Sequence, residues 1–289
     1  MKILITGGAG FIGKYLANRL CSEHEVTIID NFYRKNNIEL NNQVNIIKKD
    51  ITNDFEELIS QNDVIYHLAA ISQVMTSIEE PELTYKVNIE ATKNIVAACA
   101  KHNKKLIFAS SREVYGTQTK LPVKLNAELN PENPYAASKL AGEALVKAYG
   151  KSFELEYNIV RMSNVYGCGD VERVIPMFID MFKNNKDVEL YGSEKIIDFV
   201  YIEDIIDAFV KLKDKSGLTL NLGSGVKTTL VELANLIKEL TNSNSNINIS
   251  SERQGEVGKF QADISETKTK LDWEPKTTLR EGLTQMINS

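Results

Sequence analysis

The stretch Lys2–Gly13, KILITGGAGFIG, decides the fold of this chain of 289 residues. It opens with a short apolar run, which predicts a buried strand. Three glycines, Gly7, Gly10 and Gly13, then stand three apart, and apolar residues at helical spacing follow from Phe11. Glycines in a strand-to-helix turn allow a tight bend and a close approach of the backbone, and the helix N-terminus attracts an anion. We therefore predict a pyrophosphate-binding turn here.

A carboxylate follows this glycine turn at the distance that dinucleotide sites require. Asp30 lies 20 residues after Gly10, at the end of the predicted strand Val26–Ile29. There it can accept hydrogen bonds from the adenosine ribose hydroxyls, and it would repel a 2′-phosphate. The sequence therefore predicts NAD as the cofactor. Arg34, close by, leaves NADP as the alternative.

A second carboxylate, Asp50, closes the next predicted strand, Asn45–Lys48. It could accept a hydrogen bond from the adenine amino group while Ile51 packs on the ring. The other interpretation is a turn or helix-capping residue before Thr52. The sequence does not decide between the two roles.

Predicted strands and helices alternate through the first part of the chain. The strands are rich in Ile, Leu and Val without polar alternation, which is typical of burial on both faces. The pattern predicts an α/β fold, a Rossmann-type doubly wound parallel sheet. The predicted elements are strands at 2–6, 26–29, 45–48, 63–68, 105–110 and 157–162, and helices at 11–21, 81–101 and 134–149.

The pattern loosens after Arg161, although helices and strands continue. We expect residues 1–165 to form the NAD-binding domain. Residues 166–289 should form mainly a smaller C-terminal substrate-binding lobe, with some elements returning to the main sheet. No Pro- or Gly-rich linker separates the two parts, so their boundary is soft.

Composition limits the possible partners. The net charge is −5, which lacks the basic footprint of nucleic-acid binding. No apolar segment has the length of a membrane helix or of a signal sequence. The three cysteines are too few and too scattered for a disulfide framework or a CxxC metal site. We expect a cytoplasmic protein with no metal, no nucleic-acid partner and no membrane association.

Tyr135 and Lys139 lie four apart on the predicted helix 134–149 and therefore share a face. A tyrosine hydroxyl that acts as a base near pH 7 needs its pKa lowered by about three units, or about 4 kcal/mol. A neighbouring ammonium favours the phenolate, and a bound nicotinamide cation would add to this effect. Ser111, at the end of the predicted fifth strand, can donate to a substrate oxygen. Such pairs also occur by chance; their position in a dinucleotide fold gives them weight.

A series of ordered motifs then runs along nearly the whole chain. Together they resemble the extended short-chain dehydrogenase/reductases, and within that family the nucleotide-sugar epimerases and dehydratases. The motifs are TGGAGFIG at 6–13, HLAA at 67–70, SSREVYG at 110–116, PYAASK at 134–139, RMSNVYG at 161–167, DFVYIED at 198–204 and LDWEP at 271–275.

The resemblance implies roles for individual residues. Tyr135 would be the base, Lys139 would bind the nicotinamide ribose, and Ser111 would bond the sugar hydroxyl that is oxidised. Asn88 would support the site. Cofactor contacts would come from Gly7, Gly10, Phe11, Ile12, Gly13, Asp30, Asn31, Asp50, Ile51, Leu68, Ala69, Ala70, Tyr135 and Lys139. Substrate contacts would come from Ser72, Ser111, Arg112, Glu113, Asn164, Arg253 and Glu256.

Two positions depart from the family pattern. Ile197 stands where many relatives have an arginine before Asp198-Phe199, so one diphosphate contact is missing or is supplied by Lys195 or Arg173. Cys168 stands where relatives often carry proline, which should alter only the loop.

The residues after Ser111 narrow the reaction. Relatives that act as 4,6-dehydratases carry Asp-Glu there, the acid and base of elimination, whereas this chain carries Arg112-Glu113. We therefore expect epimerisation at C4 of a nucleotide-diphosphate sugar, with UDP as the expected nucleotide, through a transient 4-keto intermediate. UDP-glucuronate decarboxylation, or another dehydratase or reductase activity, is the alternative. A non-catalytic NAD-binding regulatory role is the third.

The resemblance also implies a homodimer. The family commonly pairs through two helices of each subunit, which here would be 81–101 and 134–149. The same apolar residues could equally belong to an ordinary core.

Overall fold

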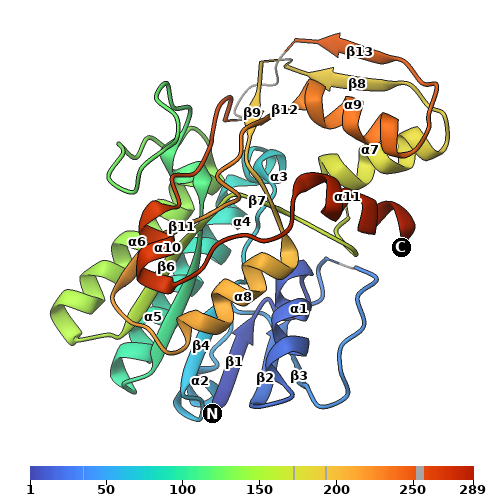
Figure 1. Cartoon of the computed structure of the whole chain (residues 1–289). Coiled ribbons are helices and arrows are strands. Elements are labelled where there is room, and N and C mark those ends of the chain that lie inside the picture. The colour runs from blue at the N-terminus through green and yellow to red at the C-terminus, as the bar shows by residue number, and fades with distance from the viewer. Residues whose placement is uncertain (35, 172, 193, 252–256) are drawn as a thin grey trace.

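The computed structural model describes residues 1–34, 36–171, 173–192, 194–251 and 257–289 (Figure 1). Its centre is one seven-stranded sheet in the order β11-β6-β5-β4-β1-β2-β3, and every neighbouring pair of strands is parallel. The predicted doubly wound parallel sheet is therefore confirmed. The strands are β1 Lys2–Thr6, β2 Glu25–Asp30, β3 Asn45–Lys48, β4 Val64–His67, β5 Lys105–Ser111, β6 Tyr157–Met162 and β11 Leu218–Leu222.

Helices cover both faces of this sheet, because the strand residues that point to either face are apolar. In β1, Ile3 and Ile5 join the core under α1 Phe11–Leu20 and α8 Ile202–Leu212, whereas Leu4 joins the core on the opposite face. That second core lies under α2 Glu56–Ser60, α5 Ala91–Lys101 and α6 Pro134–Phe153.

The second half of the chain contributes both to this sheet and to a smaller group of elements. β11 forms an edge of the main sheet beside β6. Three short strand pairs lie elsewhere: β7 Asn164–Tyr166 with β10 Phe199–Tyr201, β8 Val188–Tyr191 with β13 Ile247–Ser250, and β9 Ile196–Ile197 with β12 Thr228–Thr229. The remaining helices of this half are α7 Val174–Lys183, α9 Leu230–Leu240, α10 Ser265–Leu271 and α11 Leu279–Asn288.

The region predicted as one long helix from Pro81 to Lys101 is not uniform. It consists of α4 Pro81–Tyr85, a π-helical turn η1 Lys86–Glu90, and α5. Sequence periodicity does not reveal a single wide turn. Such π turns occur frequently at functional sites, and this one carries Asn88. The short helix α3 Val74–Glu79 precedes this region.

Helix α6 also runs further than the predicted end at Tyr149. It continues through Gly150 to Phe153 and ends at Glu154, whose φ of 56° is left-handed. Gly150 lies against the ring of Tyr157, where a Cβ atom would approach within 2.3 Å. The glycine is therefore a close-packing position between helix and strand and not a helix stop.

Candidate active site

The glycine turn joins β1 to α1 at the carboxyl edge of the sheet, as predicted. Gly7 has a φ of 69°, which side chains rarely adopt, and a Cβ there would lie 2.7 Å from the backbone of Ala69. At Gly13 a Cβ would lie 2.3 Å from the carbonyl oxygen of Gly7. These glycines therefore let the turn, the start of α1 and the end of β4 approach one another closely, and Leu68, Ala69 and Ala70 follow that end of β4.

Asp30 lies directly beside this turn. Its Oδ2 accepts a hydrogen bond from the backbone N–H of Ala9 at 3.0 Å, and its Oδ1 accepts from Phe32 at 2.7 Å. The carboxylate is thus held at the edge of the turn, in the place where the sequence argument puts the adenosine ribose.

Asp50 has the turn role that the sequence left open. Its Oδ1 accepts from the backbone N–H of Thr52 at 2.9 Å, and its Oδ2 accepts from Asn31 Nδ2 at 2.8 Å. Burial works to raise the pKa of Asp50, but these hydrogen bonds outweigh it and hold the pKa below its usual range. Asn31 and Asp50 are therefore joined side by side at the ends of neighbouring strands. A contact of Asp50 or Ile51 with adenine stays a prediction.

Three side chains meet where β5 faces the first turn of α6. The side chains of Ser111 and Tyr135 are hydrogen-bonded. The Nζ of Lys139 lies 6.0 Å from the centre of the Tyr135 ring, on the same helix face, and donates to the carbonyl of Ala109 at 2.8 Å. The grouping of Tyr135, Lys139 and Ser111 that the sequence predicted is therefore present in the structure.

Burial dominates the protonation of this group. It raises the pKa of Tyr135; the hydrogen bond from Ser111 and the charges of Arg173 and Arg112 act in the opposite direction without reversing it. Burial also lowers the pKa of Lys139 to about 7, so its ammonium is only partly populated near neutral pH. The chain's own groups therefore leave Tyr135 a weaker acid than usual, and the lowering expected from the sequence requires a further positive charge.

Arg112 and Glu113 lie beside this trio in the 3-10 turn η2 Arg112–Tyr115. Arg112 Nη2 and Glu113 Oε1 are 2.8 Å apart, and both side chains are about one-tenth exposed. The second oxygen of Glu113 accepts from Asn133 Nδ2 at 3.1 Å. Asn133 also caps the N-terminus of α6, two residues before Tyr135. The Arg-Glu pair is therefore tied to the helix that carries the predicted base.

Asn88, which the resemblance implied as a support of the site, lies in the π turn. Its amide holds the backbone of Ile71 through both N–H and C=O at 2.9 Å. Ser72 follows, and its hydroxyl accepts from Arg34 at 3.3 Å. Arg34 is thus directed toward the loop that follows β4.

Arg173 is one of the two cations considered as replacements for the family arginine at Ile197. Its guanidinium lies 5.9 Å from the ring centre of Phe11, at the start of α1, and its Nη1 donates to the carbonyl of Val165. The other candidate, Lys195, is buried, as is Ile197 itself, which packs in the main core. Asn164 lies at the start of β7, and its buried Oδ1 has no hydrogen-bond donor among the described residues.

Arg253 and Glu256, the predicted contacts to the diphosphate and the nucleotide ribose, lie outside the described residues. The structure therefore does not place them.

Sequence reasoning missed a buried ionic network behind the site. Glu143 on α6 pairs with Arg161 on β6 through two bonds of 2.7 and 2.8 Å, and Ser110 donates to the same carboxylate. Arg161 also donates to Tyr115 Oη, which donates to Asn221 on β11. The signal was a charged residue inside an otherwise apolar strand, since a charge that is buried needs a partner.

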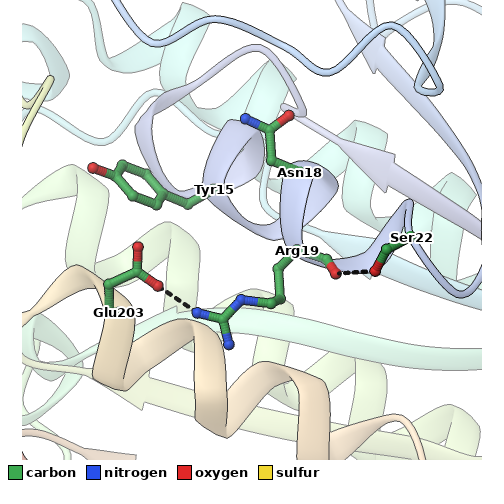
Figure 2. A pocket seen from close by; sticks show the side chains of 5 residues that line it. All are labelled: Tyr15, Asn18, Arg19, Ser22 and Glu203. Carbon is green, nitrogen blue, oxygen red and sulfur yellow. Dashed lines mark hydrogen bonds and ion pairs between the residues drawn. The ribbon is translucent and has the colours of Figure 1, made fainter.

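A separate hollow of about 370 Å³ lies between α1 and α8, lined by Tyr15, Asn18, Arg19, Ser22 and Glu203 (Figure 2). Arg19 spans it by pairing with Glu203 and with Asp207. None of the predicted catalytic residues lines it. Arg19 and Glu203 pair across the two packed helices, and the other polar groups that line it donate to backbone carbonyls. We therefore assign the hollow to the packing of the fold and not to the site.

The model of the NAD dependent epimerase/dehydratase family matches residues 3–223. A UDP-N-acetyl-alpha-D-glucosaminuronate decarboxylase of Bacillus cytotoxicus is 34% identical, with 99% of this chain and 96% of that protein aligned. The structure superposes on the UDP-glucose 4-epimerase of Thermotoga maritima with a TM-score of 0.94 and 29% identity, covering 100% and 98% of the two chains. The UDP-glucuronic acid 4-epimerase of Bacillus cereus, solved with UDP-glucuronic acid and NAD, gives a TM-score of 0.93 and 30% identity over 100% and 98%.

The fold and the site define a dinucleotide-binding protein of the short-chain dehydrogenase/reductase type. The chain belongs to the NAD dependent epimerase/dehydratase family, and its relatives include nucleotide-sugar epimerases and decarboxylases. NAD is the cofactor, and the glycine turn with Asp30 fits it. No helix among the described segments is both long enough and apolar enough to cross a bilayer.

Proposed function

We propose that this protein epimerises C4 of a nucleotide-diphosphate sugar, a UDP-sugar in the first instance, through a transient 4-keto sugar. The observation that carries the proposal is the contact of Tyr135 with Ser111 at the carboxyl end of β5, with Lys139 on the same helix face. A sugar hydroxyl that lies between Ser111 and Tyr135 can lose its proton to Tyr135 as C4 is oxidised.

Each protein group has a separate task in this reaction. Ser111 donates to the sugar oxygen and fixes its position, and Tyr135 takes the proton and later returns it. Lys139, held against the carbonyl of Ala109, presents donors to the nicotinamide ribose. Bound NAD supplies hydride transfer to and from C4 and a positive ring that favours the phenolate form of Tyr135.

Arg112 supports epimerisation over dehydration. Elimination of water from C5 and C6 needs an acid to protonate the leaving hydroxyl, and a guanidinium does not give up its proton. Glu113 is occupied by Arg112 and Asn133. Decarboxylation remains the second candidate, since it requires no such acid and a decarboxylase is 34% identical. The proposal includes the cytoplasmic homodimer expected from the sequence.

The test is to incubate the purified protein and NAD with UDP-, GDP-, dTDP- and CDP-sugars and to analyse the products by mass spectrometry and NMR. A product of unchanged mass with inverted C4 supports the proposal. Loss of carbon dioxide or of water overturns it in favour of the corresponding alternative.

Tyr135→Phe tests the proposed base. It should abolish turnover and leave NAD bound, because only the hydroxyl is removed. The matched control is Tyr149→Phe, further along the same helix, where the ring lies tilted against that of Phe153 with the centroids 4.9 Å apart. Full activity of Tyr135→Phe would remove the base from the mechanism.

A further inference from the structure

Arg112 is a buried cation at the catalytic end of β5. It follows Ser111 directly, its side chain is 10% exposed, and its guanidinium carbon lies 5.7 Å from the ring centre of Phe260. The ring supports one face of the guanidinium, and such stacking favours arginine over lysine. The side chain is therefore held in place and is not a mobile surface charge.

One end of this guanidinium has no hydrogen-bond acceptor among the described residues. Nη2 is paired with Glu113 Oε1 at 2.8 Å, whereas the buried Nη1 has no hydrogen-bond acceptor in the described part of the chain. Leaving a buried charged donor unpaired costs more than about 1–3 kcal/mol, so such groups usually bind something. Glu113 cannot serve both ends, because its other oxygen accepts from Asn133.

This unpaired end belongs to the site where the sugar reacts. Arg112 is close enough to Tyr135 for its charge to favour the phenolate. Asn133 connects the Arg112–Glu113 pair to the first turn of α6, two residues before Tyr135. A sugar whose 4-hydroxyl lies between Ser111 and Tyr135 therefore places its neighbouring carbons within the surroundings of Arg112.

The position open to a ligand is Nη1 of Arg112. The other charges that act on Tyr135 belong to ion pairs, since Arg112 is paired with Glu113 and Arg173 with Asp170. A neutral hydroxymethyl group on C5 can accept a hydrogen bond from Nη1 but brings no negative charge. An ionised carboxylate on C5 gives Nη1 a charge-assisted hydrogen bond, which is the stronger kind.

We propose that Arg112 binds a carboxylate on C5 of the sugar, so that the substrate is a nucleotide-linked uronate. The inference rests on the proposed function only in placing the sugar 4-hydroxyl at Tyr135. It holds whether the 4-keto sugar is reduced on the other face or loses carbon dioxide. The diphosphate is the other anion that Arg112 could bind. Acidic and neutral nucleotide sugars both carry the diphosphate, so in that case loss of Arg112 would weaken the binding of both equally.

The experiment compares UDP-glucuronate with UDP-glucose, which differ only at C6. For the wild-type protein with NAD, kcat/KM should favour the uronate by about 30-fold or more, the size expected when a buried charge pair forms. Arg112→Gln should reduce that preference to within a few-fold of unity, and Arg112→Lys should keep part of it. Arg280→Gln on α11, which breaks an exposed pair with Glu239 on α9, is the control and should leave the preference unchanged.

Binding provides a second measurement that does not depend on turnover. In Tyr135→Phe with NAD, the Kd of UDP-glucuronate should be lower than that of UDP-glucose, and adding Arg112→Gln should remove the difference. An equal loss for both sugars overturns the inference in favour of a diphosphate contact. Equal turnover of both sugars by the wild-type protein also overturns it.

The two proposals fail in different ways. Epimerisation of neutral sugars alone contradicts the uronate inference and leaves the proposed function intact. Decarboxylation of UDP-glucuronate supports the uronate inference and contradicts the proposed epimerase activity. In every arm, far-ultraviolet circular dichroism and NAD binding identify a variant that has failed to fold, for which Arg112→Lys then replaces Arg112→Gln.

Discussion

Asn88 Nδ2 donates to Ser138 Oγ at 3.0 Å, and Ser138 Oγ donates to the carbonyl of Tyr135 at 2.7 Å. The same Asn88 amide clamps the backbone of Ile71. One side chain in the π turn therefore fixes both the turn of α6 that carries Tyr135 and the loop that follows β4. We therefore propose that Asn88 positions Tyr135 for the reaction and does not itself contact the reacting atoms.

The first prediction is that Asn88→Ala lowers kcat by about 10- to 100-fold, because small displacements of a reacting group cost this much. The Kd of NAD should change little, since the glycine turn and Asp30 are untouched. Steady-state kinetics and NAD titration measure both quantities. Asn235→Ala, which removes an exposed bond to Val231 on α9, is the matched control. Unchanged kcat in Asn88→Ala would contradict the positioning role.

The second prediction concerns the cost of Lys139 to the fold. Burial lowers its pKa to about 7 from an unfolded value near 10.4, so burying the ammonium destabilises the protein at and below neutral pH. Lys139→Met should therefore be at least as stable as wild type, and by up to a few kcal/mol more stable, even though the bond to Ala109 is lost. Activity should vanish.

Urea unfolding at pH 6.5 without added NAD measures this difference, since bound cofactor would stabilise the wild type by mass action. Lys147→Met serves as the control on the same helix, since the Lys147 side chain is 42% exposed, although its partner Glu143 is buried. A clear loss of stability in Lys139→Met would contradict this prediction. It would show that the contacts of the ammonium stabilise the fold by more than the free energy that its burial costs.

The third prediction is a pH dependence of stability from His67. Its ring lies between the hydroxyls of Thr6 and Thr92, and burial, aided by the charge of Lys139, lowers its pKa to about 3. The unfolded chain binds this proton near pH 6.5, whereas the native state does not. The stabilisation is therefore present above pH 6.5 and is lost as pH falls from there toward 3, by up to about 1.4 kcal/mol per pH unit.

Urea unfolding between pH 4.5 and 8 tests this slope, and His67→Gln should flatten it. His102→Gln, at a partly exposed pair with Glu56, is the control that keeps the wild-type slope. If His67→Gln and wild type have parallel pH profiles, the buried imidazole is not the linked group.

The part of the site that the sequence predicted depends on short spacings. Gly7 to Gly13 lie in one turn, and Tyr135 and Lys139 lie one helical turn apart, so local geometry alone places them. Parallel strands then bring Asp30 and Ser111 to the same edge, because the carboxyl ends of such strands meet there. The fold and the spatial grouping of Tyr135, Lys139 and Ser111 were predictable for this reason, whereas their catalytic role stays a prediction.

The partners of these residues were not predictable, because they depend on packing between distant segments. The wide turn at Asn88 has the same periodicity as an ordinary helix, so only its contacts with Ile71 and Ser138 reveal it. The pKa of Tyr135 was expected to fall, whereas burial raises it, and burial is a property of the whole fold. The number of Arg112 nitrogens that find an acceptor likewise depends on packing, because Asn133 occupies the second oxygen of Glu113.

The last prediction concerns the buried pair Glu143–Arg161, which joins α6 to β6 behind the catalytic residues. Burial works to raise the pKa of Glu143, but the bonds from Arg161 and Ser110 hold it below its usual range. Glu143→Ala leaves the buried Arg161 without its counter-ion, with neutral acceptors alone, so it should cost about 3–5 kcal/mol of unfolding free energy. Glu143→Leu combined with Arg161→Met should cost much less, because no charge remains buried.

Glu266→Ala, which breaks an exposed pair with Lys270, is the control and should cost under about 1 kcal/mol. Urea unfolding of all three variants measures the differences, and equal losses in the single and double variants would mean that packing, and not the stranded charge, sets the cost.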